Sequence, residues 1–321
     1  MQSQNKPFVV ALEEHYWDAD LVALYPGREG KRISGVEKRL LDLGELRLRE
    51  MDDAGVDVQV LSHGAPGTQK LDADTAVRMS RQTNDRLHAF IQTNSKRFAA
   101  FGILPTPDPK AAADELERVV TKLGFKGAMI HGLTNGRFID DRQFWPIFER
   151  AAKLDVPLYI HPSFPNPAVA AAYYNDYVAK YPEILGPALG FTVEAATQGV
   201  RLVLSGLFEQ YPGLKMILGH LGEGIPFLLW RIDQSFSRPG NSGGSFRHVF
   251  REHFHLTTSG NFSDTALACS VAEMGIDRIM FSVDWPFIGN DLGTRWLENA
   301  ALSDEDKAKV FGGNARKLLK L

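Results

Sequence analysis

The sequence predicts an α/β fold, a distorted (β/α)8 TIM barrel made by a single domain that spans residues 1–321. Three observations lead to this fold class. Apolar, strand-like runs alternate with longer helix-like segments, eight such units follow one another, and no linker-like stretch separates them. The length of 321 residues fits one barrel of about 250 residues with insertions.

The predicted strands are short apolar runs, several of them continuous, as is typical of parallel strands covered on both faces. They span residues 8–15, 56–63, 98–105, 125–132, 156–162, 214–222, 254–261 and 276–285. The predicted helices span residues 35–54, 72–95, 109–123, 141–154, 182–211, 223–236, 263–274, 292–299 and 303–321. Asp108 before Pro109 is a capping start, and Ser303 before Asp306 resembles a capping box. In the first helix, Arg47 interrupts an apolar stripe.

Two irregular segments follow predicted strands, and they predict loop insertions over the active face of the barrel. They span residues 21–31 and 162–182, after the first and fifth strands. The segments that follow barrel strands form the face on which chemistry takes place. Residues 237–244 (SRPGNSGG) are predicted to form a flexible loop.

The composition argues against several classes of partner. The net charge is −3 and the basic residues are scattered, so neither nucleic acid nor a membrane is expected to bind. Cys269 is the single cysteine, which excludes an intrachain disulfide and agrees with a reducing compartment. No signal peptide is recognisable, and no apolar run approaches the roughly 18 residues of a spanning helix. We therefore expect a cytoplasmic protein.

Four residues of the types that bind metal ions stand at the ends of three predicted strands: Glu13, His15, His161 and Asp284. Glu13 and His15 are two positions apart, so both side chains lie on the same face of the strand and can reach one ion. Carboxylate and imidazole ligands suit a borderline divalent cation such as Zn²⁺ or Mn²⁺, and Fe²⁺ or Co²⁺ is also compatible.

Five of the nine histidines stand at the carboxyl ends of predicted strands: His15, His63, His131, His161 and His220. A single histidine in such a place is more often a structural, hydrogen-bonded residue than a ligand. Taken with Glu13 and Asp284, however, the set favours a functional site.

The motif LGHLGEG (residues 218–224) carries a second candidate pair, His220 and Glu223. A carboxylate behind an imidazole raises its basicity and fixes its tautomer. The alternative for Glu223 is an acid favoured by the helix dipole in a first turn. Asp284 can bind a metal, move a proton or do both; the alternative is a helix N-cap or turn aspartate, and the following Trp-Pro disfavours a simple cap.

Several segments resemble the amidohydrolase superfamily, in the branch of γ-resorcylate and other non-oxidative aromatic acid decarboxylases. They are ALEEH at residues 11–15, HP at 161–162, residues 185–233, LTTSGNF at 256–262, DRIMFSVDWPF at 277–287 and the final NARKLLKL. The resemblance implies that Glu13, His15, His161 and Asp284 bind one divalent cation, and that His220 and Glu223 are catalytic. It also implies a homodimer or homotetramer, with Arg231 as a candidate for contacts with the substrate or between subunits.

The chain departs from the resorcylate pattern at positions that are expected to face the substrate. The pattern has Asn at His131, Leu-Asn at His63 and Gly64, and HPRNP where this chain has HPSFP; the loop before Tyr173 also differs. We therefore predict that His63 and His131 contact the substrate. The departures leave the metal ligands intact and the exact aromatic acid open.

The expected activity is metal-dependent decarboxylation of an ortho-hydroxy aromatic acid. Asp284 is the predicted proton donor to the ring, and release of CO₂ follows. No organic cofactor is expected, because the metal and the phenol supply the electron sink. The alternative is a metal-dependent hydrolase of a lactone, ester or amide, or a hydratase, with the same mononuclear site. A ligand-binding protein without activity is the third possibility, and the full set of site residues argues against it.

Overall fold

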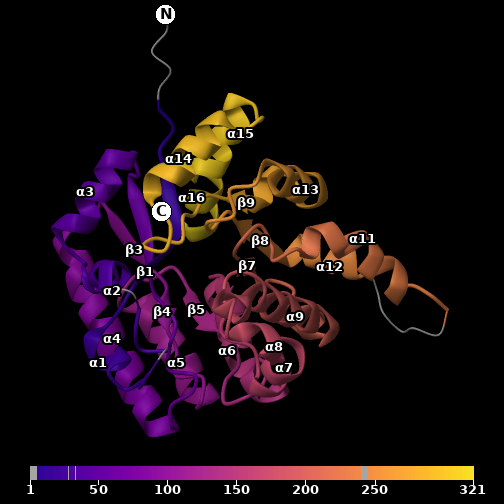
Figure 1. The fold of residues 1–321 in the computed structure, drawn as a ribbon, viewed down its shortest axis with the longest axis horizontal. Coiled ribbons are helices and arrows are strands. Elements are labelled where there is room, and N and C mark those ends of the chain that lie inside the picture. Colours follow the sequence, from indigo (N-terminus) through magenta and orange to yellow (C-terminus); the bar gives the residue numbers. More distant parts are fainter. Residues whose placement is uncertain (1–5, 28, 33, 240–244) are drawn as a thin grey trace, which may run out of the picture.

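The computed structural model describes residues 6–27, 29–32, 34–239 and 245–321. Strands lie at the centre and helices surround them (Figure 1). The strands are β1 (Val10–Tyr16), β2 (Val58–His63), β3 (Phe98–Ala100), β4 (Gly102–Ile103), β5 (Ala128–His131), β6 (Leu158–His161), β7 (Met216–Leu218), β8 (Phe254–Thr257) and β9 (Ile279–Met280). All their pairings are parallel, so the predicted α/β class is confirmed.

Ladder hydrogen bonds in the described part of the chain form two sheets, in the orders β1-β2-β3 and β4-β5-β6-β7-β8-β9. The sheets meet on two sides. Phe101, between β3 and β4, donates its N–H to the carbonyl of Leu61 in β2 at 2.9 Å. On the other side, His15 of β1 donates its N–H to the carbonyl of Trp285, just beyond β9, at 2.7 Å.

The helices cover the strands from outside (Figure 1). Their bounds are α1 (Ala19–Val22), α2 (Ser34–Leu41), α3 (Glu45–Ala54), α4 (Ala73–Thr93), α5 (Pro109–Thr121), α6 (Trp145–Leu154), α7 (Pro167–Tyr173), α8 (Asn175–Val178), α9 (Gly190–Leu204), α10 (Leu207–Gln210), α11 (Ile225–Phe236), α12 (Phe246–His253), α13 (Asp264–Met274), α14 (Asn290–Asn299), α15 (Asp304–Ala308) and α16 (Asn314–Leu319). Both predicted capping starts are confirmed: the side chains of Asp108 and Ser303 accept backbone N–H bonds at the starts of α5 and α15.

The structure corrects several predicted elements. The third predicted strand is divided into β3 and β4, which pair with different neighbours. The segment predicted to be irregular at 162–182 contains α7 and α8. Helix α12 was missed, although Ser245 caps it and Phe246 and Phe250 form a buried i,i+4 pair. Part of the predicted loop 237–244 lies outside the described residues.

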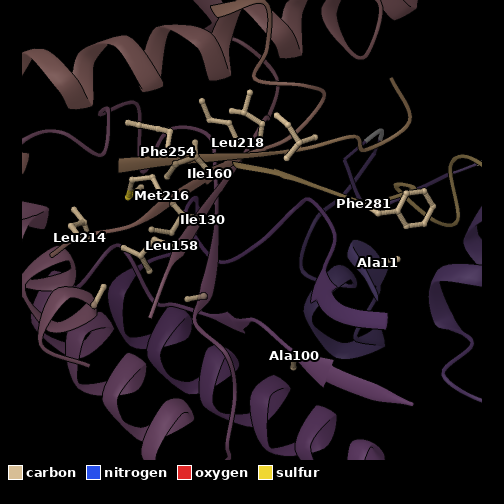
Figure 2. Close-up of a cluster of buried hydrophobic side chains, with 14 of the residues drawn as sticks. Ala11, Ala100, Ile130, Leu158, Ile160, Leu214, Met216, Leu218, Phe254 and Phe281 are labelled. Atoms are coloured by element: carbon tan, nitrogen blue, oxygen red, sulfur yellow. The ribbon is translucent and has the colours of Figure 1, made fainter. Parts of the chain in front are cut away.

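The core around the larger sheet includes aliphatic side chains from neighbouring strands. Figure 2 shows Ile130, Leu158, Ile160, Met216 and Leu218 packed together; each is at most 2% exposed. This buried layer holds β5, β6 and β7 in register, with His131 directly beside His161. Among the described residues, no helix has both the length and the apolar character needed to cross a membrane.

Candidate metal centre

The four predicted metal ligands come together: Glu13 and His15 lie within β1, His161 is the last residue of β6, and Asp284 follows β9. One ligand atom from each of Glu13, His15, His161 and Asp284 lies within 4.8 Å of the others. Glu13 Oε1 is 3.2 Å from His161 Nε2 and 3.8 Å from His15 Nε2. Asp284 Oδ1 is 3.3 Å from His15 Nε2. The i,i+2 spacing of Glu13 and His15 therefore brings both to one point, as expected.

The atoms that face one another in this cluster fit a bound cation. Glu13 Oε1, His15 Nε2 and Asp284 Oδ1 are buried and have no hydrogen-bond partner among the described residues. Buried polar atoms are costly when they have no partner, so three of them aimed at one point need an explanation. Two carboxylates and two imidazoles form a donor set that suits Zn²⁺ or Mn²⁺.

Neighbouring side chains form hydrogen bonds with the candidate ligands at the atoms that face away from the cluster. The hydroxyl groups of Tyr159 and Ser259 donate to Glu13 Oε2, which leaves Oε1 for the cluster. Ser62 Oγ lies 3.1 Å from His15 Nδ1, so Nε2 faces the other ligands. These contacts join residues of separate segments and follow no motif, so the sequence does not predict them. Such outer contacts orient metal ligands and tune their basicity.

Asp284 has a left-handed backbone, and its neighbour Glu14 holds it there. The φ angle of Asp284 is 69°, a strained value for a residue other than glycine. The Glu14 carboxylate accepts hydrogen bonds from the N–H groups on both sides, from Val283 at 2.9 Å and from Trp285 at 3.2 Å. Because successive side chains of a strand point to opposite sides, Glu13 faces the cluster, whereas Glu14 binds the backbone around Asp284.

The arginine that interrupts the apolar stripe of the first predicted helix lies beneath this site. Arg47 is completely buried, donates to the carbonyl of His15 at 2.6 Å, and lies over the Trp285 ring at 3.9 Å. It therefore contacts two of the three segments that carry candidate ligands, through the His15 carbonyl and the Trp285 ring. A charged residue in a helical apolar stripe was the sequence signal for this role.

His220 and Glu223 form the predicted pair. His220 Nδ1 lies 2.7 Å from Glu223 Oε1, and both residues have positive φ in the turn between β7 and α11. Burial lowers the pKa of His220, but Glu223 and Glu13 outweigh this effect and raise it to about 10. Because Glu223 precedes the Gly224 N-cap of α11, it is not a first-turn helix acid.

The carboxyl groups of the cluster differ in their electrostatics. Burial opposes ionisation of Glu13, but nearby His220, His15 and His161 lower the pKa of its carboxyl well below the usual value. For Asp284, burial and the charge of Glu13 raise the pKa. Paired groups whose environments shift their pKa values in opposite directions are typical of acid–base sites.

The three predicted substrate contacts occupy different places. His63 and His131 are buried at the ends of β2 and β5, and both ring nitrogens of each are within hydrogen-bond distance of protein groups. A contact with substrate through these nitrogens would require an exchange of bonds, so this role stays a prediction. Arg231 lies exposed on α11 and has no hydrogen bond to the four clustered residues in the described structure.

The sequence pattern of the amidohydrolase family matches residues 14–321, which include His15, His161 and Asp284. The chain belongs to the amidohydrolase family. A γ-resorcylate decarboxylase from Polaromonas sp. (strain JS666 / ATCC BAA-500) is 39% identical over 328 residues, covering 97% of this chain and 98% of that protein.

Two solved structures of amidohydrolase relatives have the same fold over nearly their whole length. A dihydroxybenzoic acid decarboxylase from Polaromonas sp. JS666, with bound manganese and the inhibitor 2-nitroresorcinol, has a TM-score of 0.89 at 38% identity and covers 98% of both chains. A 5-carboxyvanillate decarboxylase from Sphingomonas paucimobilis has a TM-score of 0.90 at 33% identity, covering 98% of this chain and 100% of that one.

Proposed function

We propose that this amidohydrolase is a metal-dependent, non-oxidative decarboxylase of an ortho-hydroxy aromatic acid of the γ-resorcylate, 2,3-dihydroxybenzoate or salicylate type. One observation carries the proposal: the four-residue cluster with three unpartnered ligand atoms lies beside the His220–Glu223 pair. A γ-resorcylate decarboxylase at 39% identity and a 5-carboxyvanillate decarboxylase at 33% are among its relatives, which supports this chemistry over hydrolysis.

In this proposal Glu13, His15, His161 and Asp284 hold one divalent cation, Zn²⁺ or Mn²⁺. The manganese in the related dihydroxybenzoic acid decarboxylase favours Mn²⁺. The cation supplies Lewis acidity toward the carboxylate and phenol oxygens of the substrate. No organic cofactor is needed for the reaction.

Asp284 has the central task among the protein groups. It delivers a proton to the ring carbon that bears the carboxylate, so a C–H bond forms there. The bond to the carboxylate then breaks, its electron pair returns to the ring, and CO₂ leaves. His220, oriented by Glu223, donates a hydrogen bond to the carboxylate or the phenolate. The same steps in reverse carboxylate a phenol when bicarbonate is abundant.

We also propose that residues 1–321 form a single domain with a distorted, closed barrel of eight strands. In this arrangement β3 and β4 are two halves of one strand. The hydrogen bonds of Phe101 to Leu61 and of His15 to Trp285 support closure, because they link the two sheets on both sides. The segments 21–31 and 162–182 then lie over the active face.

We propose further that the chain forms a homodimer or homotetramer through the exposed side of α11. Phe227 is 82% exposed, Trp230 60% and Leu228 44%, beside Arg231. Large apolar side chains gathered on one helix surface are typical of a protein interface. Light scattering of the wild type and of Trp230→Glu tests this: the variant is expected to have the smaller mass.

The experiment that tests the activity is an ultraviolet assay of the Mn²⁺-loaded protein with carboxyl-labelled 2,6-dihydroxybenzoate, 2,3-dihydroxybenzoate, salicylate and 2-hydroxy-1-naphthoate. The proposal predicts release of labelled CO₂ and formation of the phenol from at least one of them. Turnover of a lactone, ester or amide, with none of these acids decarboxylated, would instead identify a hydrolase.

A further inference from the structure

Hydrogen bonds connect three histidines, His63, His131 and His161, the last of which is a candidate metal ligand. At its start, the N–H of Asp18 donates to His63 Nε2 at 3.0 Å, so this nitrogen is an acceptor. His63 Nδ1 therefore carries the proton and donates to the carbonyl of Gly64 at 2.7 Å. The carbonyl of His63 in turn lies 2.8 Å from His131 Nε2. Because a carbonyl oxygen can only accept, His131 carries a proton on Nε2.

The next contact joins two ring nitrogens, His131 Nδ1 and His161 Nδ1, at 3.1 Å. One proton must lie between them. His161 Nδ1 is also 2.7 Å from the carbonyl of Pro162. If the proton were on His131, two acceptors would face each other at that short distance. The proton therefore belongs to His161 Nδ1, which shares it between Pro162 and His131 Nδ1.

This arrangement leaves a lone pair on His161 Nε2, the atom that lies 3.2 Å from Glu13 Oε1 in the metal cluster. We propose that His131 is a positioning residue of the metal centre: its Nδ1 accepts from His161 Nδ1 and so fixes the tautomer and ring orientation that a metal ligand needs. The inference rests on the proposed cation but not on the proposed reaction.

Packing keeps the His131 ring in place for this task. The parallel register sets His131 of β5 beside His161 of β6, and the two rings meet edge to face at 4.8 Å between centroids. His131 is 3% exposed. A Cβ atom at Gly67 would lie 3.0 Å from His131 Cδ2, so glycine there leaves room for the ring.

The test compares Mn²⁺ affinity in variants that remove or retain the acceptor. His131→Phe keeps a ring and removes both nitrogens, whereas His131→Asn places an amide oxygen close to the position of Nδ1. The matched control is His255→Phe, another buried strand histidine, whose hydrogen bond goes to Arg278. Free Mn²⁺ is measured by electron paramagnetic resonance during titration of metal-free protein.

The proposal predicts a dissociation constant about 10 to 100 times larger for His131→Phe, in the range found when outer-shell partners of ligands are removed. His131→Asn should recover most of the affinity, and His255→Phe should bind like the wild type. Wild-type affinity in His131→Phe would overturn the proposal, and so would equal losses in the Phe and Asn variants.

A second measurement is independent of whether the variants fold. In metal-free wild-type protein labelled with ¹⁵N-histidine, the imidazole spectrum should show the proton of His161 on Nδ1 and that of His131 on Nε2. A proton on His131 Nδ1 would overturn the proposal. If the affinities and tautomers follow the prediction while no aromatic acid is decarboxylated, the proposed function fails and the role of His131 stands.

Discussion

Two buried regions of this molecule contrast sharply: the polar layer around the metal cluster, and the aromatic stack of α12 and β8. In the stack, Phe250 and Phe254 lie parallel at 4.4 Å between ring centroids, and Phe246 continues it at 6.2 Å from Phe250. In the polar layer, ligand atoms of Glu13 and Asp284 are buried and have no hydrogen-bond partner in the part of the chain that the structure describes.

Strained backbone conformations concentrate in the polar layer rather than in the aromatic stack. The described residues include eight non-glycine positions with positive φ, and five of them follow β7, β8 or β9 around the site: His220, Leu221, Glu223, Ser259 and Asp284. Such conformations persist only where the surrounding structure stabilises them. Apolar packing therefore supplies the stability that keeps the reactive groups of the polar layer in strained conformations.

The largest expected effect is the loss of turnover in Asp284→Asn, which removes the proposed proton donor and keeps the shape of the side chain. We expect kcat to fall by about 10⁴-fold, at the upper end for loss of general acid catalysis, while metal binding weakens only partly. Because burial and Glu13 already disfavour the ionised form of Asp284, the metal-free variant should be at least as stable as the wild type. Near-normal turnover would remove Asp284 as the donor.

Phe250→Ala tests whether the aromatic stack of α12 and β8 stabilises the fold. Phe250 is completely buried, so truncation should lower the free energy of unfolding by about 3–5 kcal/mol. The folded variant should keep its Mn²⁺ affinity. Leu292→Ala, at a side chain that is 53% exposed, is the control and should change stability by about 0.5 kcal/mol or less. Equal denaturation midpoints for Phe250→Ala and wild type would refute the role assigned to the stack.

His220→Asn should reduce turnover by about 10²–10³-fold without loss of the metal, because the proposed mechanism has His220 contact the substrate rather than the cation. Metal content and kcat are measured on the same preparation. Glu223→Gln, which keeps the shape of its partner, should cause a smaller loss. An inactive His220→Asn protein that also lacks metal would make His220 a ligand instead.

The smallest expected effect is a change in how stability depends on pH, and it concerns Glu194 of α9. Burial, only partly offset by Gln198, raises the pKa of its carboxyl to about 8 from 4.5. The folded state therefore keeps a proton that the unfolded state releases, so stability falls as the pH rises from about 4.5 through 8. Glu194→Gln should add about 1–3 kcal/mol more stability at pH 8 than at pH 5. Urea midpoints that shift equally at both pH values would contradict this.

Periodicity and strand ends were sufficient to predict most of the site. The i,i+2 spacing brought Glu13 and His15 to one face, and the ends of β6 and β9 supplied His161 and Asp284. What the sequence could not reveal are contacts between distant segments. The hydrogen bond from Tyr159 to Glu13 depends on how strands are aligned, and alternation alone does not give that alignment.

The fold was predictable to a similar extent. Its parallel α/β class followed from the alternation of apolar runs and helical segments, whereas the division of the third strand at Phe101 did not. The orientation of each histidine ring could not be predicted from the sequence either. It is set by backbone carbonyls such as that of His63, whose orientation depends on the local geometry of the strand ends.

The most direct test of the central claim is a titration of metal-free protein with Mn²⁺, in which bound metal and turnover of an ortho-hydroxybenzoate are followed together. The account predicts that turnover is absent without metal and rises in proportion to bound Mn²⁺ until one ion is bound per chain. Turnover in the fully metal-free protein, or saturation of binding without decarboxylation of any ortho-hydroxybenzoate, would contradict it.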